Sequence, residues 1–254
     1  MTFWEHLDEL RGSIVRMLIA ATACAVVAFC LKDPLFDIVL APRSSSFITY
    51  QLLQTEPFHL DLMNTGLAEQ FTIHMKTAFV AGLIVASPYL LFMLYRFVAP
   101  ALYDGERREV RRVVGFGYAM FMVGVVLNYF LVFPLTVHFL GTYQVSADVR
   151  NMLTLQSYVD TLLMMSLVMG IVFEIPVVSW LLARLGLIRA EWMTHYRRHA
   201  IVVILTVAAA ITPTTDIFTL LVVAMPIWLL YEASIWIVER VNKLTSKQVD
   251  ELTS

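Results

Sequence analysis

Long apolar stretches without charged residues recur along the chain and are separated by short charged segments. Six of them are candidate membrane-spanning helices, at residues 14–31, 77–95, 113–137, 161–183, 200–213 and 217–238. A transmembrane helix needs about 20 mostly apolar residues. The first four stretches reach this length if Arg16 extends to the membrane interface. The pattern therefore predicts an all-α, polytopic membrane protein with six transmembrane helices.

The last two apolar stretches are short. Only 12 residues of the fifth, up to Ile211, are free of turn signals. At about 1.5 Å per residue they reach about 18 Å, against a hydrocarbon core of about 30 Å. Glu232 interrupts the sixth stretch. Such helices require a thinner bilayer or shielding by neighbours. The alternative is a re-entrant hairpin with its tip at residues 212–216.

The longest connection between the apolar stretches is residues 32–76. It contains three prolines, among them Pro42, and several apolar segments. We expect it to fold as a cap over the outer ends of the helices. Polar residues 241–254 predict a cytoplasmic tail, so residues 1–240 are expected to form a single transmembrane domain.

The chain begins with a polar and amphipathic segment. Residues 2–5 have the pattern of a capping box, which marks the start of a helix. Phe3, Leu7, Leu10 and Ile14 then fall on one helical face. Acidic side chains accompany the first arginine, whereas a signal peptide begins with a basic region. The pattern predicts a short amphipathic helix on the membrane surface that leads into the first span.

The basic residues are distributed unequally between the two sides. Six spans place both termini on one side, which carries all of the 18 Lys and Arg residues except Lys32, Arg43, Lys76 and Arg150. Cytoplasmic loops carry an excess of Lys and Arg. We therefore expect both termini in the cytoplasm and the protein in the cytoplasmic, or inner, membrane.

Composition supports the membrane assignment. Hydrophobic residues make up 59% of the chain, charged residues 15%, and the mean hydropathy is +0.74. Soluble domains are about half apolar and a quarter charged. This balance excludes an ordinary soluble enzyme, a disordered chain and a nucleic-acid binder. Cys24 and Cys30 lie in one apolar run, without the spacing of a disulfide framework or metal site.

The chain has no recognisable enzyme motif. It contains no His-Glu-x-x-His zinc helix, no nucleophile elbow and no phosphate-binding glycine loop. His195 and His199 are four residues apart and could share a helix face, but they lie among arginines. A solvated or interfacial role is favoured over a metal pair. We expect no metal, no cofactor and no catalytic residue.

Glu174 is the most costly residue of the apolar stretches, because it lies near the middle of the fourth one. A central acidic residue costs roughly 3 kcal/mol or more on insertion scales. Pro176 follows and predicts a kink, since proline removes a backbone hydrogen bond. Glu174 is either a protonated carboxyl that joins neighbouring helices or a site on a transport pathway or partner surface.

Acidic residues also occur among the basic cytoplasmic segments. Asp8 and Glu9 lie near the N-terminus, and Glu106 precedes Arg107 and Arg108. Carboxylates bind arginines in a bidentate manner, so these residues suit a cationic ligand. Intramolecular pairing with the neighbouring arginines is the alternative, and charge alone favours it.

Six motifs, in order along nearly the whole chain, resemble the TatC family, the multispanning core of the twin-arginine protein translocase. They are His6-Leu7-Asp8-Glu9-Leu10-Arg11; Glu69-x-Phe71 with Lys76; Phe97-Val98-Ala99-Pro100-Ala101-Leu102-Tyr103 with Glu106-Arg107; Tyr129-Phe130 with Phe133-Pro134; Phe173-Glu174-x-Pro176; and Thr212-Pro213 with Asp216, Pro226 and Leu230-Tyr231-Glu232. Each motif alone is weak. Six in order on a six-span pattern are specific.

The resemblance implies a receptor and scaffold that binds signal peptides with two consecutive arginines and organises export of folded proteins. It implies that Glu9 and Glu106 receive the arginine pair and that Arg11 organises the N-terminal site. Glu174 would be the intramembrane carboxyl on a concave face. Structural positions of the family match Pro42, Phe71, Pro100 and Asp216.

The same resemblance implies partners and an energy source. The partners would be single-span proteins of the TatA and TatB types, further copies of this chain and membrane lipid. The energy would come from the proton motive force. The first alternative is a proton-coupled small-solute transporter with Glu174 as the coupling carboxyl. An intramembrane hydrolase is a weaker alternative, because no histidine lies near Ser87, Ser166 or Ser179 in the sequence.

Overall fold

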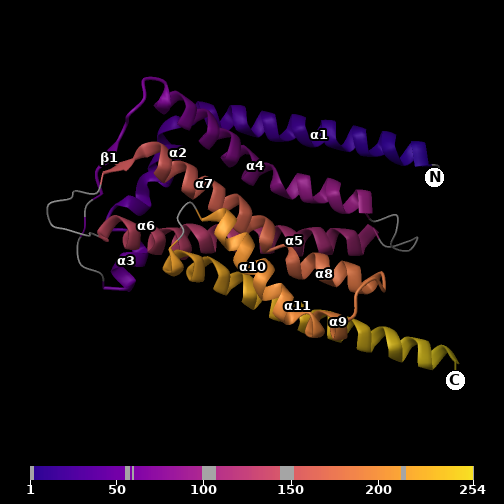
Figure 1. Ribbon diagram of the computed structural model, residues 1–254. Helices are drawn as coiled ribbons and strands as arrows, with labels where there is room; N and C mark the ends of the chain where they lie inside the picture. The colour runs from indigo at the N-terminus through magenta and orange to yellow at the C-terminus, as the bar shows by residue number, and fades with distance from the viewer. Residues whose placement is uncertain are drawn as a thin grey trace.

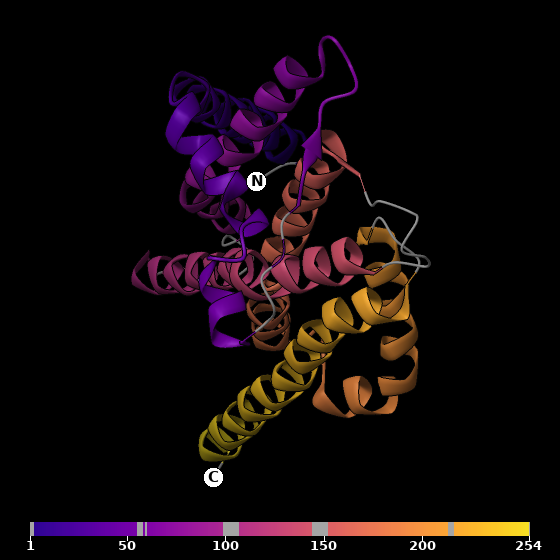
Figure 2. The ribbon, with the colours of Figure 1, turned by 90° about the vertical axis from the view of Figure 1, so that its left-hand side faces the viewer.

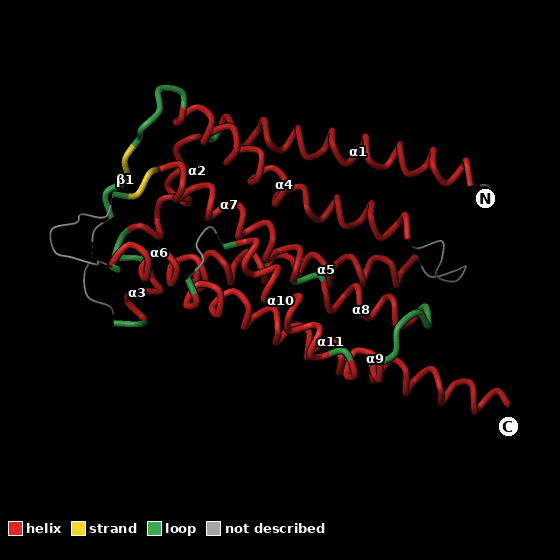
Figure 3. The backbone as a smooth tube through the Cα atoms, in the orientation of Figure 1, coloured by secondary structure: helices red, strands yellow, loops and turns green. Residues whose placement is uncertain are grey.

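The molecule is a bundle of helices in which both chain ends lie at the same end (Figure 1). A computed structural model describes residues 3–54, 58, 60–98, 107–143, 152–212 and 216–253. Its elements are α1 (Phe3–Cys30), α2 (Lys32–Leu40), η1 (Ala41–Arg43), α3 (Ile48–Leu52), β1 (Leu62–Met63), α4 (Glu69–Val98), α5 (Arg107–Leu127), η3 (Asn128–Val132), α6 (Phe133–Thr142), β2 (Leu153–Thr154), α7 (Leu155–Val172), α8 (Ile175–Arg184), α9 (Ala190–His195), α10 (Arg197–Ile211) and α11 (Ile217–Thr253). The described chain is almost entirely helical (Figure 3).

Five segments of the described chain are helical, long and apolar enough to cross a membrane. They are Leu10–Cys30, Glu69–Arg96, Val113–Thr142, Leu155–Arg184 and Ile217–Lys243. Long helices suit a bilayer because all their backbone hydrogen bonds are internal. The prediction of an all-helical polytopic membrane protein is therefore confirmed. The expected fifth span corresponds to α10, whose 15 residues reach about 22 Å. The count of six spans stays a prediction.

The last helix is not short, and this part of the prediction was wrong. Helix α11 has 37 residues and continues through Glu232 and the expected polar tail as far as Thr253. The Glu232 carboxylate accepts a hydrogen bond at 2.8 Å from Arg197, at the start of α10. Because this ion pair partly neutralises the carboxylate, Glu232 does not end the apolar helix.

Helix α1 is also longer than expected, since the amphipathic segment and the first span form one continuous helix. It packs lengthwise on α4, on the opposite side of the molecule from α11 (Figures 1 and 2). Gly82 of α4 allows this contact. A Cβ atom there would lie 2.5 Å from the backbone nitrogen of Ala25. Small residues let transmembrane helices approach closely.

Prolines have different effects in the individual helices. The kink expected at Pro176 is present: α7 and α8 are separated at Phe173 and Glu174, and Pro176 lies in the first turn of α8. Pro134 follows a π-helical segment, η3, which leads into α6. Such π-bulges insert one residue into a helix and change its direction. Pro88 and Pro226, in contrast, lie within continuous helices.

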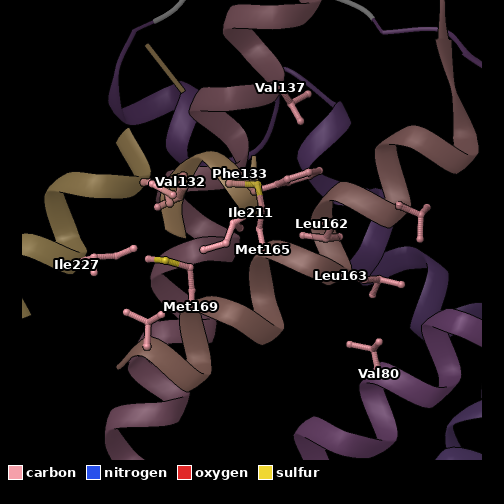
Figure 4. Packing of buried hydrophobic residues seen from close by; sticks show 14 of the residues in the cluster. Val80, Val132, Phe133, Val137, Leu162, Leu163, Met165, Met169, Ile211 and Ile227 are labelled. Carbon is pink, nitrogen blue, oxygen red and sulfur yellow. The ribbon is translucent and has the colours of Figure 1, made fainter. Parts of the chain in front are cut away.

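The core is centred on α7. The segment Leu155–Arg184, which contains α7, has 61% of an apolar 18-residue stretch buried inside the molecule. The corresponding share in α1 is 6%. Met165 and Met169 of α7 belong to one buried cluster with Ile211 of α10 and Ile227 of α11 (Figure 4). Helix α7 is thus shielded from lipid by its neighbours, whereas α1 presents apolar side chains outward.

The described parts of residues 32–68, which are 32–54, 58 and 60–68, lie at the end of the bundle opposite the termini (Figure 1). The buried Tyr50 hydroxyl of α3 donates a shared hydrogen bond to the carbonyl oxygens of Pro42, at 2.9 Å, and Pro134, at 3.0 Å. Burial raises the pKa of this hydroxyl, so it stays a donor. Strands β1 and β2 form a short parallel pair. These contacts join the segment to α6 and α7.

Glycines permit the closest approach of α5 to α7. A Cβ atom at Gly124 would lie 2.5 Å from the carbonyl oxygen of Met169, and one at Gly170 would lie 2.6 Å from the ring of Phe121. Neither neighbour can yield without moving backbone or a buried ring. The two helices therefore require a glycine at both positions.

Gly124→Ala is expected to lower the free energy of unfolding in detergent by about 1–3 kcal/mol, because the methyl group overpacks the α5–α7 contact. Gly115→Ala on the same helix is the control, since nothing lies within 4 Å of a Cβ there. It should raise stability by up to about 1 kcal/mol through helix propensity. Equal effects of the two substitutions would contradict the packing argument. Denaturant titration followed by circular dichroism measures both.

Candidate functional site

The helix ends that carry or adjoin the residues expected to bind a signal peptide lie at the end of the bundle where both termini are found. Helix α1 starts there with Glu9 and Arg11, and α4 ends and α5 begins at the same end (Figure 1). The Arg11 side chain is exposed. Pro100, Glu106 and the side chain of Glu9 lie outside the described residues.

Glu174 lies in the two-residue break between α7 and α8, and its side chain is buried inside the bundle. It is 9% exposed. Its Oε2 atom accepts a hydrogen bond at 3.1 Å from the hydroxyl of Tyr95, which is itself buried near the end of α4. Its Oε1 atom has no hydrogen-bond partner in the part of the chain that the structure describes. A buried acceptor without a partner is costly, so this carboxyl is not explained by helix packing alone.

Gly117 of α5 makes room for this hydrogen bond. A Cβ atom at position 117 would lie 3.1 Å from Oε2 of Glu174 and 3.2 Å from the ring of Tyr95. Sequence reasoning identified Glu174 but neither Tyr95 nor Gly117. An aromatic residue near the end of an apolar stretch is typical of a membrane interface, so Tyr95 gave no separate signal.

A second buried polar pair lies between η3 and α7. The side-chain amide of Asn128 donates to the hydroxyl of Ser166 at 2.9 Å. Asn128 is fully buried, and its Oδ1 atom is without a partner among the described residues. Like the Tyr95–Glu174 pair, this pair is buried, joins two helical segments and has one oxygen without a partner among the described residues. Unlike that pair, it contains no carboxyl group.

At the opposite end, Glu69 joins the starts of α4 and α7. Its Oε2 atom accepts hydrogen bonds from the backbone nitrogens of Gly66, at 2.7 Å, and Thr65, at 2.8 Å, and from the Thr65 hydroxyl, at 3.1 Å. Its Oε1 atom accepts from the backbone nitrogen of Gln156, at 3.2 Å. Glu69 is thus a structural anchor, a role that the motif around Phe71 did not reveal.

Two neighbours of Glu69 in the same motif are more exposed. Lys76 forms an ion pair at 2.9 Å with Asp160 of α7, a second link between these helices. Phe71 is 60% exposed, and its ring contacts that of Phe29 edge-on, with centroids 6.5 Å apart. Phe71 therefore faces outward beside α1.

Asp216 precedes α11 and caps it. Its Oδ1 atom accepts a hydrogen bond at 2.7 Å from the backbone nitrogen of Thr219, in the pattern of a helix N-cap. The side-chain oxygens of Thr212 and Thr219 are buried without a partner in the described part of the chain. Asp216 therefore has a local structural role at the turn between α10 and α11.

The two histidines considered as a metal pair do not share a helix face. His195 ends α9 and His199 belongs to α10, and each of the two rings contacts the ring of Tyr196, with centroids 5.1 Å and 5.5 Å away. Within the described ranges, no three His, Cys, Asp or Glu side chains come together in a possible metal site.

Comparison with known proteins gives one consistent result. The family described as Sec-independent protein translocase protein (TatC) matches residues 5–226. The Sec-independent protein translocase protein TatC of Blattabacterium sp. subsp. Periplaneta americana is 33% identical, over 96% of this chain and 97% of the relative. That of Koribacter versatilis is 37% identical, over 92% of this chain and 84% of the relative.

A solved structure agrees over nearly the whole length. The crystal structure of the twin arginine translocase receptor TatC has a TM-score of 0.80 and 30% identity, and the match covers 93% of this chain and 99% of that one. The resemblance inferred from the six motifs is confirmed. Family membership also indicates a transport subunit that is not an enzyme, and it favours protein translocation over the small-solute transporter and the hydrolase. With its motifs, helical fold and full-length relatives in agreement, this chain belongs to the TatC family of Sec-independent protein translocase proteins.

Proposed function

We propose that this chain is the receptor that binds the two consecutive arginines of a signal peptide at the end of the bundle carrying the termini. Glu9 and Glu106 accept the two guanidinium groups, and Arg11 organises the N-terminal part of the site. Carboxylates bind guanidinium groups through paired, charge-assisted hydrogen bonds, which distinguish arginine from lysine.

The observation that carries this proposal is the convergence of three helix ends. The start of α1, the end of α4 and the start of α5 all lie at one end of the bundle (Figure 1). Glu9 belongs to the first of these segments, and Glu106 directly precedes α5. Glu9 is thus on a helix that starts at the same end of the bundle as α5, the helix that follows Glu106 in the sequence.

This end is proposed to face the cytoplasm, with the protein in the cytoplasmic membrane as a six-span, multi-pass protein. Both termini lie at the same end, which requires an even number of crossings (Figure 1). Helix α10 supplies the crossing that the five long helices lack. The excess of basic residues at this end supports the orientation.

The wider assembly follows from family membership. We propose that the chain organises export of folded proteins together with single-span partners of the TatA and TatB types and further copies of itself. The solved TatC structure is described as a twin arginine translocase receptor, which supports the receptor role. Transport is proposed to use the proton motive force.

Glu9→Gln and Glu106→Gln are each expected to weaken binding of an Arg-Arg signal peptide at least tenfold, or about 1.4 kcal/mol. Each amide keeps the shape of the side chain but removes the charge that attracts guanidinium. Fluorescence anisotropy of a labelled peptide with the purified protein measures the affinity. A Lys-Lys peptide should bind the wild-type protein more weakly than the Arg-Arg peptide.

The matched control is Glu191→Gln, which removes an exposed acidic side chain on α9 at the same end. It should leave peptide affinity unchanged. If both Glu9→Gln and Glu106→Gln bound the Arg-Arg peptide as tightly as the wild type, the receptor site would lie elsewhere.

A further inference from the structure

Helix α9 rests against α11 and leaves its own side chains outside the core. It is six residues long, and none of its residues is buried. The carbonyl oxygen of Met193 accepts a hydrogen bond at 2.8 Å from the hydroxyl of Tyr231 of α11. Directly after α9, Arg197 forms its ion pair with Glu232 of α11. A backbone hydrogen bond and an ion pair therefore fix the position of α9 without burying any of its side chains.

The contact with α9 lies within the apolar part of α11. The part of α11 that is long and apolar enough to cross a membrane is Ile217–Lys243. Twelve residues, or about 18 Å of helix, separate Tyr231 from Lys243. Helix α11 continues beyond α9 toward the C-terminus, and Trp236 in this part is 54% exposed (Figure 1). Because the apolar surface of α11 extends past the level of α9, α9 lies at the depth of the membrane rather than beyond it in the water.

The side chains of α9 are divided between an aromatic and a polar face. Trp192 and Tyr196 are both 55% exposed. The backbone nitrogen of Tyr196 donates to the carbonyl oxygen of Trp192 at 2.9 Å, so the two rings are one helical turn apart on one face. Glu191 and Thr194, also exposed, fall about 100–160° away from Trp192 around the helix. Aromatic and polar residues on separate faces are typical of a helix that lies in a membrane surface.

Two exposed arginines flank the aromatic face. Arg189 is the N-cap residue of α9, and Arg198 lies in the first turn of α10. An arginine at a membrane surface packs its aliphatic stem on apolar groups while its charge reaches the lipid head groups. Tryptophan and tyrosine are enriched at the same depth. A lipid surface therefore suits both the rings and the basic side chains.

The aromatic face is small for a protein partner. Helix α9 is about 9 Å long, and a tryptophan or tyrosine side chain buries about 150–250 Å². A stable protein–protein interface buries about 800 Å² on each partner. Two aromatic side chains supply about half of this area at most. The bilayer, in contrast, has no minimum contact area, since it surrounds every exposed part of α11 at this depth.

We propose that α9 is an interfacial anchor, with Trp192 and Tyr196 inserted among the lipid head groups of the leaflet on the side of the termini. Helix α8 ends the apolar segment Leu155–Arg184, and α10 is the proposed fifth crossing. A connection between two crossings lies at a membrane surface. The anchor rests on this proposed crossing, but not on the signal-peptide site.

The test measures where α9 lies in vesicles that contain the purified full chain with phosphatidylcholine and phosphatidylglycerol. In a Cys24→Ala/Cys30→Ala background, a nitroxide label is attached at Trp192→Cys or Tyr196→Cys. Power saturation of the electron paramagnetic resonance signal compares collisions with oxygen, which concentrates in lipid, and with a water-soluble nickel complex. Oxygen should dominate at both positions. At Thr194→Cys, on the polar face of the same helix, the ratio should reverse.

Two further measurements make the result specific. Val203→Cys labels an exposed position within α10 and reports the proposed crossing separately, so oxygen should dominate there as well. The native ring is tested by fluorescence quenching, since a label replaces it. Lipids with brominated acyl chains should quench the part of the emission that is lost in Trp192→Phe. Melting curves of the same samples show that each variant is folded.

Three results would overturn the anchor. If nickel dominated at positions 192 and 196 while oxygen dominated at Val203→Cys, α10 would cross the membrane but α9 would lie in water. If nickel dominated at position 203 too, the crossing by α10 would fail together with the anchor. Broadening between labels at position 192 that disappears on dilution with unlabelled protein would assign the aromatic face to a second copy of the chain. The peptide-binding assay on the same variants reports the receptor site independently.

Discussion

Glu69→Ala is expected to lower the melting temperature of the purified protein by roughly 5–10 °C. The reason is the concentration of hydrogen bonds on one buried carboxylate. Backbone nitrogens of Thr65, Gly66 and Gln156 all donate to Glu69. Alanine removes the one acceptor that these three partly buried backbone hydrogen bonds share, so all three are lost at once.

The substitution removes hydrogen bonds at one point, but it should destabilise a larger part of the molecule. Gln156 lies in the first turn of α7, which belongs to the most buried of the five long spans, and the neighbouring β1–β2 pair joins Leu62 to Leu153. Without the carboxylate, the segment before α4 is no longer anchored to α7. Proteolysis of residues 60–68 in folded protein should therefore accelerate together with the fall in melting temperature.

Glu239→Ala is the matched control for Glu69→Ala. Glu239 is also a helical glutamate with a hydrogen-bonded partner, but it is exposed and pairs with Lys243 one turn away. Exposed pairs of this kind contribute little, so the melting temperature should change by no more than about 1 °C. Similar effects of the two substitutions would exclude Glu69 as an anchor. Differential scanning fluorimetry in detergent measures both.

Much of the fold was predictable because lipid imposes a simple constraint. A chain in a bilayer must satisfy its backbone internally, so apolar stretches between charges become helices. The wrong predictions, in contrast, concern contacts between residues that are far apart in the sequence. Glu232 was expected to shorten the last helix, but its partner Arg197 is 35 residues away in the sequence. Such a pair has no local pattern from which it could be inferred.

The candidate site shows the same limit. Glu174 was recognisable because an acidic residue in an apolar stretch is costly wherever it packs. Its environment was not recognisable, since Tyr95 and Gly117 meet it only through the packing of α4 and α5 against α8. The role of Glu69 was hidden for a related reason. Its donors are backbone nitrogens, which every residue except proline possesses.

The double variant Tyr95→Phe/Glu174→Leu is expected to stay folded, within about 1 kcal/mol of the wild type, while export of folded cargo falls at least tenfold. Replacing both partners of a buried hydrogen bond by apolar groups of similar shape is nearly neutral, and it also removes the Oε1 atom that has no partner in the described chain. Tyr95→Phe alone leaves both carboxyl oxygens without a partner, so it should destabilise the protein by about 1–3 kcal/mol.

The comparison distinguishes two roles for Glu174. If the carboxyl only joined helices, the double variant would retain both stability and export, because apolar groups would replace the hydrogen-bonded pair. If it belongs to the transport pathway, export falls while stability is retained. The matched control is Asn128→Leu/Ser166→Ala, which removes the other buried polar pair and should leave export near the wild-type level. Unfolding in detergent measures stability, and export of a folded reporter in cells that depend on this chain measures function. Full export by the double variant would exclude Glu174 from the transport mechanism, because no carboxyl would then be needed at this position.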